Sequence, residues 1–312
     1  MSALAGRVAI VTGAGRGLGR AHALLLARLG AAVVVNDLGG DVHGAGQDTT
    51  PARQVVDEIR HAGGQAVVSG HDVADWAQAA ALVGLAVTTF GDLHVLVNNA
   101  GILRDRTLAK MSEAEWDSVV RVHLKGHAAP TAHALAYWRR RAGEGAKPEA
   151  SVIHTTSVAA FAGNIGQANY GAAKMAMLAL SRCVSLEAGR HGVRSNAVSP
   201  GARTRITESA GLSGANEVPD GAFDPADPAN VSPLVAWLAQ AGCPADGQVF
   251  HCSGEEIIVV DMPRVAARLR TEGRWTLPEL DRRLPEALRT PPVLDDFFGG
   301  AEPARSGTES GR

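Results

Sequence analysis

Short apolar runs rich in β-branched residues alternate with longer, alanine-rich stretches along most of the chain. The runs fit buried strands of roughly four to eight residues, and the stretches between them fit helices. We predict strands at residues 7–12, 32–36, 65–69, 93–97, 151–155, 193–198 and 247–251. Such an alternation requires right-handed crossovers, which build a parallel sheet with helices on both faces. The pattern therefore predicts a doubly wound α/β fold.

The domain organisation follows from the length and from where the alternation stops. The 312 residues can bury one large core, and no second domain is required. We expect this domain over residues 1–252, an extension over 253–288 and a flexible tail over 289–312, which is rich in Pro, Gly and Glu. The extension holds an apolar run at 257–260 and a helix-like stretch at 263–272. Three roles fit it: a cover over a substrate site, a subunit interface, or surface cladding.

A glycine turn follows the first predicted strand and precedes an Ala/Leu-rich helix over about residues 20–29. Glycine lets the backbone turn tightly, and it lets a pyrophosphate approach the free N–H groups at the positive end of a helix. The spacing of Gly13, Gly17 and Gly19 differs from the G-x-G-x-x-G pattern of other dinucleotide folds. With this strand and helix beside it, the turn favours a dinucleotide site over a plain loop.

Polar residues stand at or just after several predicted strand ends, where ligands bind in open α/β sheets. Asp37 can accept hydrogen bonds from the adenosine ribose and would repel a 2′-phosphate, which predicts NAD. Arg16 in the glycine turn argues for NADP, but Asp37 should meet the ribose directly and carries more weight. The alternatives are a turn aspartate at Asp37 and a helix cap at Asp72. Asn99 and Ser157 occupy similar positions.

Tyr170 and Lys174 are four residues apart, so a helix would place them on one face. A nearby ammonium favours the phenolate, and it can thereby make a tyrosine useful as a general acid or base. Taken alone, the pair favours the simpler interpretation of an amphipathic residue beside a solvated charge.

Composition narrows the classes of protein. The net charge is -2 and no long basic run occurs, so nothing indicates nucleic-acid binding; Arg139–Arg141 reads as a solvated helix end. The three cysteines are scattered, which favours reduced thiols over disulfides or a metal site. The first strand begins within about six residues of the start, and no apolar run reaches the ~20 residues of a membrane span. We therefore expect a cytoplasmic protein without a metal.

Four motifs in order resemble the signature of the short-chain dehydrogenase/reductase family: Thr12–Gly19, Asn98–Gly101, Ser157, and the pair Tyr170 and Lys174. The resemblance spans about residues 4–252. It implies a Rossmann-type fold, hydride transfer with a nicotinamide, and a homodimer or homotetramer. Tyr170 would donate or accept the proton, and Lys174 would lower its pKa and contact the nicotinamide ribose. Ser157, thirteen residues before Tyr170, would hydrogen-bond the substrate oxygen.

The resemblance also implies the residues that contact the cofactor. Thr204 follows the Pro–Gly loop one residue earlier than is common, and the small and turn-forming residues at 205–228 suggest a substrate lid. The implied cofactor residues are Gly13, Arg16, Gly17, Leu18, Gly19, Asp37, Asp72, Val73, Asn99, Ala100, Gly101, Tyr170, Lys174, Pro200, Gly201 and Thr204.

Within the family, several segments are similar to the (3R)-hydroxyacyl-CoA dehydrogenase part of multifunctional enzyme type 2, also called 17β-hydroxysteroid dehydrogenase type 4. They are residues 36–41, the glycine-rich insert that follows to residue 51, and residues 99–106, 121–126 and 163–170. This similarity implies NAD-dependent oxidation of a 3-hydroxyacyl-CoA, with a steroid side-chain thioester as one candidate. The other functions considered are an NADPH-dependent ketoreductase and a non-catalytic dinucleotide-binding protein.

One position departs from the family pattern. His123 stands where many members carry an asparagine that helps to hold the water of the proton relay. A histidine can both donate and accept hydrogen bonds. We therefore weigh a role in catalysis against that of a packed or exposed bystander.

Overall fold

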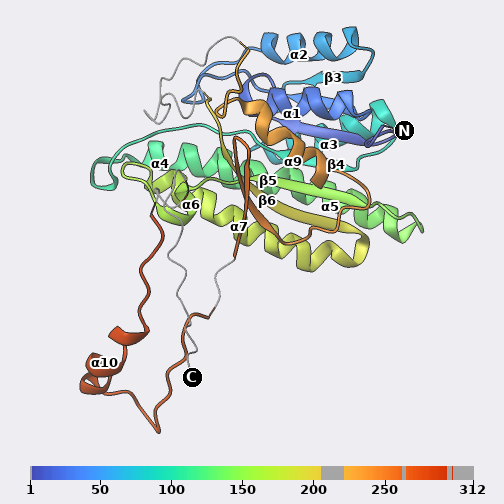
Figure 1. Cartoon of the computed structure of the whole chain (residues 1–312). Helices are drawn as coiled ribbons and strands as arrows, with labels where there is room; N and C mark the ends of the chain where they lie inside the picture. The colour runs from blue at the N-terminus through green and yellow to red at the C-terminus, as the bar shows by residue number, and fades with distance from the viewer. Residues whose placement is uncertain (1, 205–220, 262–264, 294–296, 298–312) are drawn as a thin grey trace.

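A computed structural model describes residues 2–204, 221–261, 265–293 and 297. It contains one eight-stranded sheet with the order β3-β2-β1-β4-β5-β6-β7-β8 (Figure 1). Seven strands are parallel, and the eighth runs antiparallel to β7. The strands are β1 (Val8–Thr12), β2 (Ala32–Asn36), β3 (Gln65–Ser69), β4 (Val95–Asn98), β5 (Ala150–Thr155), β6 (Val193–Gly201), β7 (Val249–Ser253) and β8 (Glu256–Val260).

The parallel strands confirm the predicted doubly wound fold. All five residues of β1 are buried, as expected for a strand covered on both faces. Val11 of β1 pairs with Val35 of β2 on one side and Val97 of β4 on the other. The chain builds outward in opposite directions from these central strands. The crevice between the carboxyl ends of β1 and β4 is therefore the switch point, where such sheets bind ligands.

Helices cover both faces of the sheet (Figure 1). One face packs against α1 (Gly17–Arg28), α2 (Thr50–His61) and α9 (Ser232–Leu238), where Leu26, Val55 and Leu238 are almost fully buried. The other packs against α3 (Trp76–Phe90), α5 (Gly126–Gly143) and α7 (Ala168–Ala188), through residues such as Leu82 and Trp138. Shorter helical elements are η1 (Leu108–Lys110), α4 (Glu113–Val120), η2 (Arg121–Lys125), α6 (Ala159–Ala162), η3 (Gly189–His191), η4 (Pro228–Val231), α10 (Leu277–Arg283) and η5 (Pro285–Ala287).

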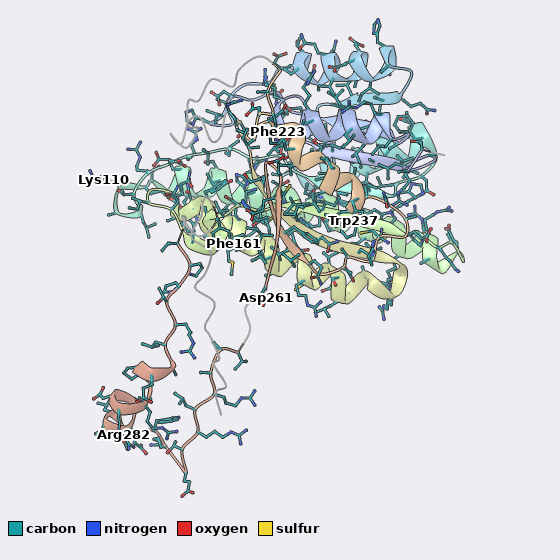
Figure 2. All side chains as sticks on the ribbon, in the orientation of Figure 1. Lys110, Phe161, Phe223, Trp237, Asp261 and Arg282 are labelled. Carbon is teal, nitrogen blue, oxygen red and sulfur yellow. The ribbon has the colours of Figure 1, made fainter. Side chains whose placement is uncertain are left out.

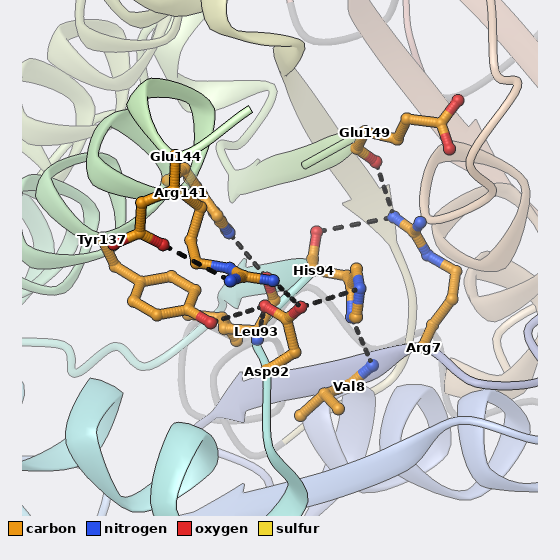
Figure 3. A network of polar contacts seen from close by, with 10 residues as sticks. Arg7, Val8, Asp92, Leu93, His94, Tyr137, Arg141, Glu144 and Glu149 are labelled. Atoms are coloured by element: carbon orange, nitrogen blue, oxygen red, sulfur yellow. Dashed lines mark hydrogen bonds and ion pairs between the residues drawn. The ribbon is translucent and has the colours of Figure 1, made fainter. Parts of the chain in front are cut away.

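A polar network joins α5 to the amino end of the sheet (Figure 3). The Asp92 carboxylate accepts a hydrogen bond of 2.7 Å from the Tyr137 hydroxyl, and Arg141 lies 3.5 Å from its other oxygen. His94 Nδ1 accepts a bond of 3.1 Å from the Val8 amide, and Arg7 donates to the carbonyl of Glu149 at 2.9 Å. These contacts fasten the sheet at the end opposite to the switch point.

The extension begins as part of the main sheet, because β8 pairs with β7. Residues 265–293, which we call the arm, then extend away from the body, with Arg282 near the tip (Figure 2). The prediction of a helix over 263–272 is wrong for residues 265–272, which are not helical. A helix forms later in the arm, at α10. A capping box of Thr276 and Glu279 and a proline at the first turn fix its start.

After the arm, the Phe297 ring stacks on Phe161 of the body with 5.4 Å between centroids. Most of the expected lid at 205–228 and of the expected tail at 289–312 lies outside the described residues.

Candidate active site

The glycine turn between β1 and α1 is built for close approach. Gly13 and Gly17 have φ angles of 63° and 51°, in the left-handed region that favours glycine. A Cβ at Gly19 would lie 2.2 Å from the Gly13 carbonyl oxygen, so no side chain fits there. Arg16 is the N-cap residue of α1, and its side chain makes no capping bond to that helix. The first N–H groups of α1 therefore retain the donors that a pyrophosphate would need.

The segment after β4 locks onto this turn. The Thr12 hydroxyl oxygen accepts hydrogen bonds from the amides of Asn99 (2.9 Å) and Ala100 (3.1 Å). The Asn99 side chain donates to the carbonyls of Thr12 (3.0 Å) and Gly13 (3.3 Å). A Cβ at Gly13 would meet the Ala100 backbone at 2.9 Å. The two predicted motifs thus form one rigid wall at the switch point.

Asp37 joins the turn to the segment that follows β2. One carboxylate oxygen accepts from the Gly15 amide and the other from the Gly39 amide, each at 2.7 Å. The alternative interpretation of Asp37 as a turn aspartate is therefore realised in the structure. It does not exclude a ribose contact, because each oxygen can accept a further bond and Asp37 also lines the cavity described next.

A cavity lies at the switch point, and eleven of the predicted cofactor residues line it. They are Gly13, Arg16, Gly17, Leu18, Asp37, Asp72, Val73, Asn99, Ala100, Gly101 and Thr204. Gly19 packs beneath the turn instead, and Gly201 lies beside Ser253 at the end of β6, next to Pro200. The role of a helix cap does not fit Asp72, because Asp75 caps α3; Asp72 accepts from the Ala74 amide and pairs with Arg121 at 2.6 Å.

Sequence reasoning did not assign part of the cavity wall. Leu38, Gly40, Asp41, Val42 and Gly44 contribute to it from the glycine-rich insert after β2. The insert is held in place because the Leu103 amide donates to the Val42 carbonyl at 2.9 Å. Its glycines were the available signal, but the long-range contact that folds it over the switch point is not readable from sequence.

Ser157 and Tyr170 meet next to Ile102, a residue of the cavity wall that packs with Tyr170. Ser157 lies between β5 and α6, Tyr170 is buried near the start of α7, and their hydroxyls interact. Burial raises the pKa of Tyr170 to about 12, although the Ser157 hydroxyl acts to lower it. The resemblance implied that Lys174 lowers the pKa of Tyr170. In the chain alone, burial has the larger effect, and the pKa of Tyr170 lies above its ordinary value.

Lys174 lies one helical turn after Tyr170 and is also buried. Its Nζ donates to the Thr155 carbonyl at 2.7 Å and lies 5.6 Å from the centre of the Tyr170 ring. Burial lowers the pKa of Lys174 to about 7. The site thus contains an amine that can gain or lose a proton near neutral pH, next to a phenol that by itself holds its proton.

The start of α7 is held by residues that sequence reasoning left without a role. Asn169 donates to the carbonyls of Arg104 and Glu115, each at 3.1 Å. Gln167 donates to the Asp105 carboxylate at 2.8 Å, and burial raises the pKa of Asp105. These bonds fix the direction in which Tyr170 points.

His123 is fully buried in η2, a π-helical turn between α4 and α5. Such turns often mark functional sites. Its ring packs edge-on against Tyr170 with 5.1 Å between centroids, and its Nε2 lies 2.8 Å from the Ile102 carbonyl oxygen. Burial, and then the charge of Lys174, hold the pKa of His123 well below its ordinary value. The structure therefore places a neutral imidazole against the tyrosine and not at the surface.

Two kinds of feature are absent from the described residues. No group of three or more His, Cys, Asp or Glu side chains there is arranged to bind a metal ion. Within the same part of the chain, no helix combines the length and the apolar character needed to cross a membrane.

Known proteins share much of this sequence and fold. Residues 7–213 match the short chain dehydrogenase family. Hydroxyacyl-CoA dehydrogenase ChsB1 of Mycobacterium tuberculosis is 41% identical over 311 residues, which cover 97% of this chain and 92% of that protein. Peroxisomal multifunctional enzyme type 2 of Drosophila melanogaster is 44% identical over 246 residues, which cover 79% of this chain but 38% of that protein. The crystal structure of a short chain dehydrogenase from Mycobacterium avium superposes with a TM-score of 0.83 and is 45% identical in sequence. The match covers 93% of this chain and 99% of the Mycobacterium avium chain.

Proposed function

The chain belongs to the short-chain dehydrogenase/reductase family, and from this premise we propose that it oxidises the hydroxyl group of a 3-hydroxyacyl-CoA to a ketone with NAD. One observation carries the proposal: Ser157, Tyr170 and Lys174 come together, and Tyr170 packs with Ile102, a wall residue of the cavity that the glycine turn and Asp37 also line. A protein that only bound a dinucleotide would not need the first three residues.

The residues at the switch point fit a nicotinamide dinucleotide. Members of the family bind this cofactor. When bound, its oxidised form would supply the hydride acceptor and a positive charge on the nicotinamide ring. The start of α1 offers N–H groups for the pyrophosphate, and the turn that carries Gly13 and Gly17 lines the cavity in front of them. Asp37 would accept from the adenosine ribose, which supports NAD over NADP.

Tyr170 acts as the general base in this proposal. Its phenolate takes the hydroxyl proton of the substrate, while Ser157 donates to the substrate oxygen and holds it in place. Because burial alone raises the pKa of Tyr170 to about 12, the base needs positive charge nearby. Lys174 is the cation that the chain itself supplies, with its Nζ 5.6 Å from the ring centre.

The names of the relatives support the class of substrate. ChsB1 is named a hydroxyacyl-CoA dehydrogenase, and it aligns with almost the whole of this chain. We therefore propose a hydroxyacyl-CoA thioester, with a steroid side-chain thioester among the candidates.

A spectrophotometric panel tests this function. The chain is mixed with NAD or NADP and with 3-hydroxyacyl-CoAs of both configurations and several chain lengths, and in parallel with free hydroxysteroids. We expect reduction of NAD with at least one 3-hydroxyacyl-CoA. Activity confined to NADPH and a carbonyl compound would indicate the ketoreductase alternative. Binding of NAD without turnover of any substrate would indicate a non-catalytic binder.

The choice of cofactor is tested at Asp37. Asp37→Ala should weaken binding of NAD far more than binding of NADP, because the repulsion of a 2′-phosphate disappears together with the ribose contact. Asp48→Ala is the matched control, since it removes a carboxylate from the same segment at a residue that does not line the cavity. An unchanged ratio of the two dissociation constants would contradict the assignment.

We also propose a cytoplasmic homodimer or homotetramer in which the extension at 253–288 contacts a second subunit or covers the substrate site. Exposed apolar side chains support a contact: Ile257 and Val259 on β8, which are 54% and 63% exposed, and Leu277 and Leu288 on the arm, at 77% and 65%. Truncation after Asp261 separates the two roles. A smaller assembly in size-exclusion chromatography indicates an interface, and a raised KM at unchanged size indicates a cover.

A further inference from the structure

The glycine-rich insert after β2 spans the switch point from one side to the other. It leaves the sheet at Asp37, which follows β2, and it contacts Leu103, which lies beyond β4. In the sheet, β1 lies between β2 and β4. The insert therefore has to pass the carboxyl end of β1, where the glycine turn lies. We call residues 38–48 the strap.

The two ends of the strap are held together at its base. The Asp48 amide donates to the Leu38 carbonyl at 3.1 Å. Gly39 lies so close to Asp48 that a Cβ on Gly39 would collide with the Asp48 carbonyl, and its φ of 80° is in the left-handed region that favours glycine. The Gly39 amide also donates to the Asp37 carboxylate at 2.7 Å. The base is therefore fixed to the end of β2.

The tip of the strap is one compact turn. The Asp41 amide donates to the Ala45 carbonyl at 2.8 Å, and the Asp41 carboxylate accepts from the amides of His43 and Ala45 at 2.8 Å and 2.9 Å. Gly40 and Gly46 join this turn to the base, and a Cβ on Gly46 would meet no atom within 4 Å. Hinges are often small residues that absorb changes in φ and ψ. The tip can thus move as a unit while the base stays in place.

Three contacts fasten the tip to the segment after β4. The Leu103 amide donates to the Val42 carbonyl at 2.9 Å, and His43 Nδ1 lies 3.0 Å from the Leu103 carbonyl oxygen. A carbonyl oxygen can only accept, so Nδ1 is the donor in this bond. Gly44 lies against Ile102, because a Cβ added to Gly44 would be 3.2 Å from the Ile102 side chain. We call these three contacts the latch.

The strap lines the same cavity as the glycine turn and the wall at Asn99–Ile102. Its lining residues are Leu38, Gly40, Asp41, Val42 and Gly44. A dinucleotide whose pyrophosphate rests on the start of α1 would therefore lie between the glycine turn and the strap. His43 does not line the cavity, so its side chain serves the latch alone.

We propose that the strap is a gate for the nicotinamide dinucleotide and that the latch opens each time the cofactor enters or leaves. This inference rests on the proposed cofactor site. A weaker latch makes the open form more frequent both before and after binding. It therefore speeds entry and departure by the same factor and leaves the dissociation constant unchanged. A strap that only formed a wall of the site would affect departure alone.

Stopped-flow fluorescence of NADH measures both rates and needs no substrate. His43→Ala removes one hydrogen bond of the latch and leaves the lining of the cavity intact. We expect association and dissociation each to become about fivefold faster, as for the loss of one hydrogen bond, at an unchanged dissociation constant. His43→Asn keeps an N–H group that can donate to the Leu103 carbonyl, and it should restore most of the wild-type rates.

His61→Ala is the matched control. His61 Nδ1 also lies 3.0 Å from a carbonyl oxygen, that of Asp57, but both residues belong to α2 and neither lines the cavity. Both rates should equal those of the wild type. If His43→Ala speeds dissociation without speeding association, the strap is only a wall of the site. Unchanged rates in His43→Ala would show that the latch does not limit exchange. Either result would overturn the proposal.

A disulfide locks the latch in the second test. A Cβ on Gly44 would lie 3.9 Å from Ile102 Cβ, which suits a disulfide. In the double variant Gly44→Cys/Ile102→Cys, oxidation should slow both rates by about 100-fold or more, and reduction should restore them. Comparison of the two forms of one protein separates the lock from any effect of the substitutions. Equal rates in both forms, with the disulfide confirmed by mass spectrometry, would contradict the gate.

These experiments separate the gate from the proposed reaction. A chain that binds NADH but oxidises no 3-hydroxyacyl-CoA would contradict the proposed substrate, and the two rates would still decide for or against the gate. A chain that binds neither NADH nor NADPH would contradict the cofactor site and the gate together.

Discussion

Tyr137 and Tyr170 are the two tyrosines of the chain, and both lie on helices that cover the same face of the sheet. They are 6% and 8% exposed, and the pKa of each is raised to about 12, with burial as the first cause. Each ring also has a cation nearby: Arg140 lies 5.2 Å from the centre of Tyr137, and Lys174 lies 5.6 Å from that of Tyr170. By these measures the two residues are nearly indistinguishable.

Their hydroxyl partners differ. Tyr137 donates to the Asp92 carboxylate at 2.7 Å, at the amino end of the sheet (Figure 3). Loss of its proton would bring two negative charges together, so this tyrosine is fixed as a donor. Tyr170 meets the neutral Ser157 hydroxyl, with Lys174 below it. The comparison teaches that the charge of the partner, rather than the size of the pKa shift, separates a structural tyrosine from one that can exchange its proton.

The largest expected effect is on turnover. Tyr170→Phe should lower kcat about 10³-fold, within the range expected for removal of the proposed general base. Tyr137→Phe makes the same chemical change at equal burial and should leave kcat close to that of the wild type. Steady-state rates with the best substrate from the panel check both variants. Equal losses in the two would abolish the distinction.

Next in size is the dependence of stability on pH that Lys174 imposes. Burial lowers its folded pKa to about 7 from the ordinary 10.5, so folding disfavours the ammonium. This cost is fully present below pH 7, where both states hold the proton. Between pH 7 and pH 10.5 only the unfolded state holds the proton, so the cost declines as the pH rises through this range. Such a shift corresponds to about 5 kcal/mol, and the lost hydrogen bond to Thr155 offsets part of it.

Lys174→Met should therefore raise the free energy of unfolding by about 2–3 kcal/mol at pH 6, with a gain that vanishes at about pH 9 and becomes a small loss at higher pH. Urea denaturation of both proteins across this range is the measurement. A difference that does not change with pH would show that Lys174 is not held in a dry environment.

A smaller effect on the free energy of unfolding is expected when Tyr137 is changed. Tyr137→Phe should lower the free energy of unfolding by about 1.5–2 kcal/mol, because it removes a part-buried hydrogen bond to a charged group. Tyr170→Phe serves as the control and should cost less, since its partner is a neutral hydroxyl. Urea denaturation at neutral pH compares them. A greater loss of stability in the Tyr170 variant would show that Tyr170, and not Tyr137, is the tyrosine with the larger structural role.

The smallest expected effect is on the free energy of unfolding, and it concerns Arg140, the cation beside Tyr137. Arg140→Met should change the free energy of unfolding by less than about 1 kcal/mol at any pH, because the Arg140 side chain is 63% exposed and water screens its charge. The measurement is the same pH series that is used for Lys174→Met. A pH-dependent change as large as that of the lysine variant would show that burial is not what distinguishes the two cations.

The sequence was sufficient for the parallel sheet, because strands buried on both faces are continuous apolar runs that stand out from their surroundings. The edge was harder to predict. β8 alternates exposed and half-buried residues, and its pairing with β7 depends on a tight reversal, so it appeared only as an apolar run in an extension. The helix expected at 263–272 began with a proline but lacked a capping box. The capping box at Thr276 and Glu279 marks the true helix and would have located it.

For the site, the positions of the motifs were predictable, but their electrostatics were not. The spacing of Tyr170 and Lys174 correctly put them on one helix face. It could not show that burial would raise one pKa and lower the other, because that depends on helices and strands far away in sequence. For the same reason, nothing along the chain predicted that His127 and His154, on different elements, would stack.

The Asp37 carboxylate, which ties Gly15 to Gly39, constrains how this enzyme could be redesigned or could evolve. A residue with one role can be exchanged freely, but the carboxylate that we propose to contact the adenosine ribose also joins two loops. A lineage that moved toward a phosphorylated cofactor would first need substitutions that fasten those loops by other means. Only then could the aspartate be given up, so the order of the mutations would matter as much as their identity.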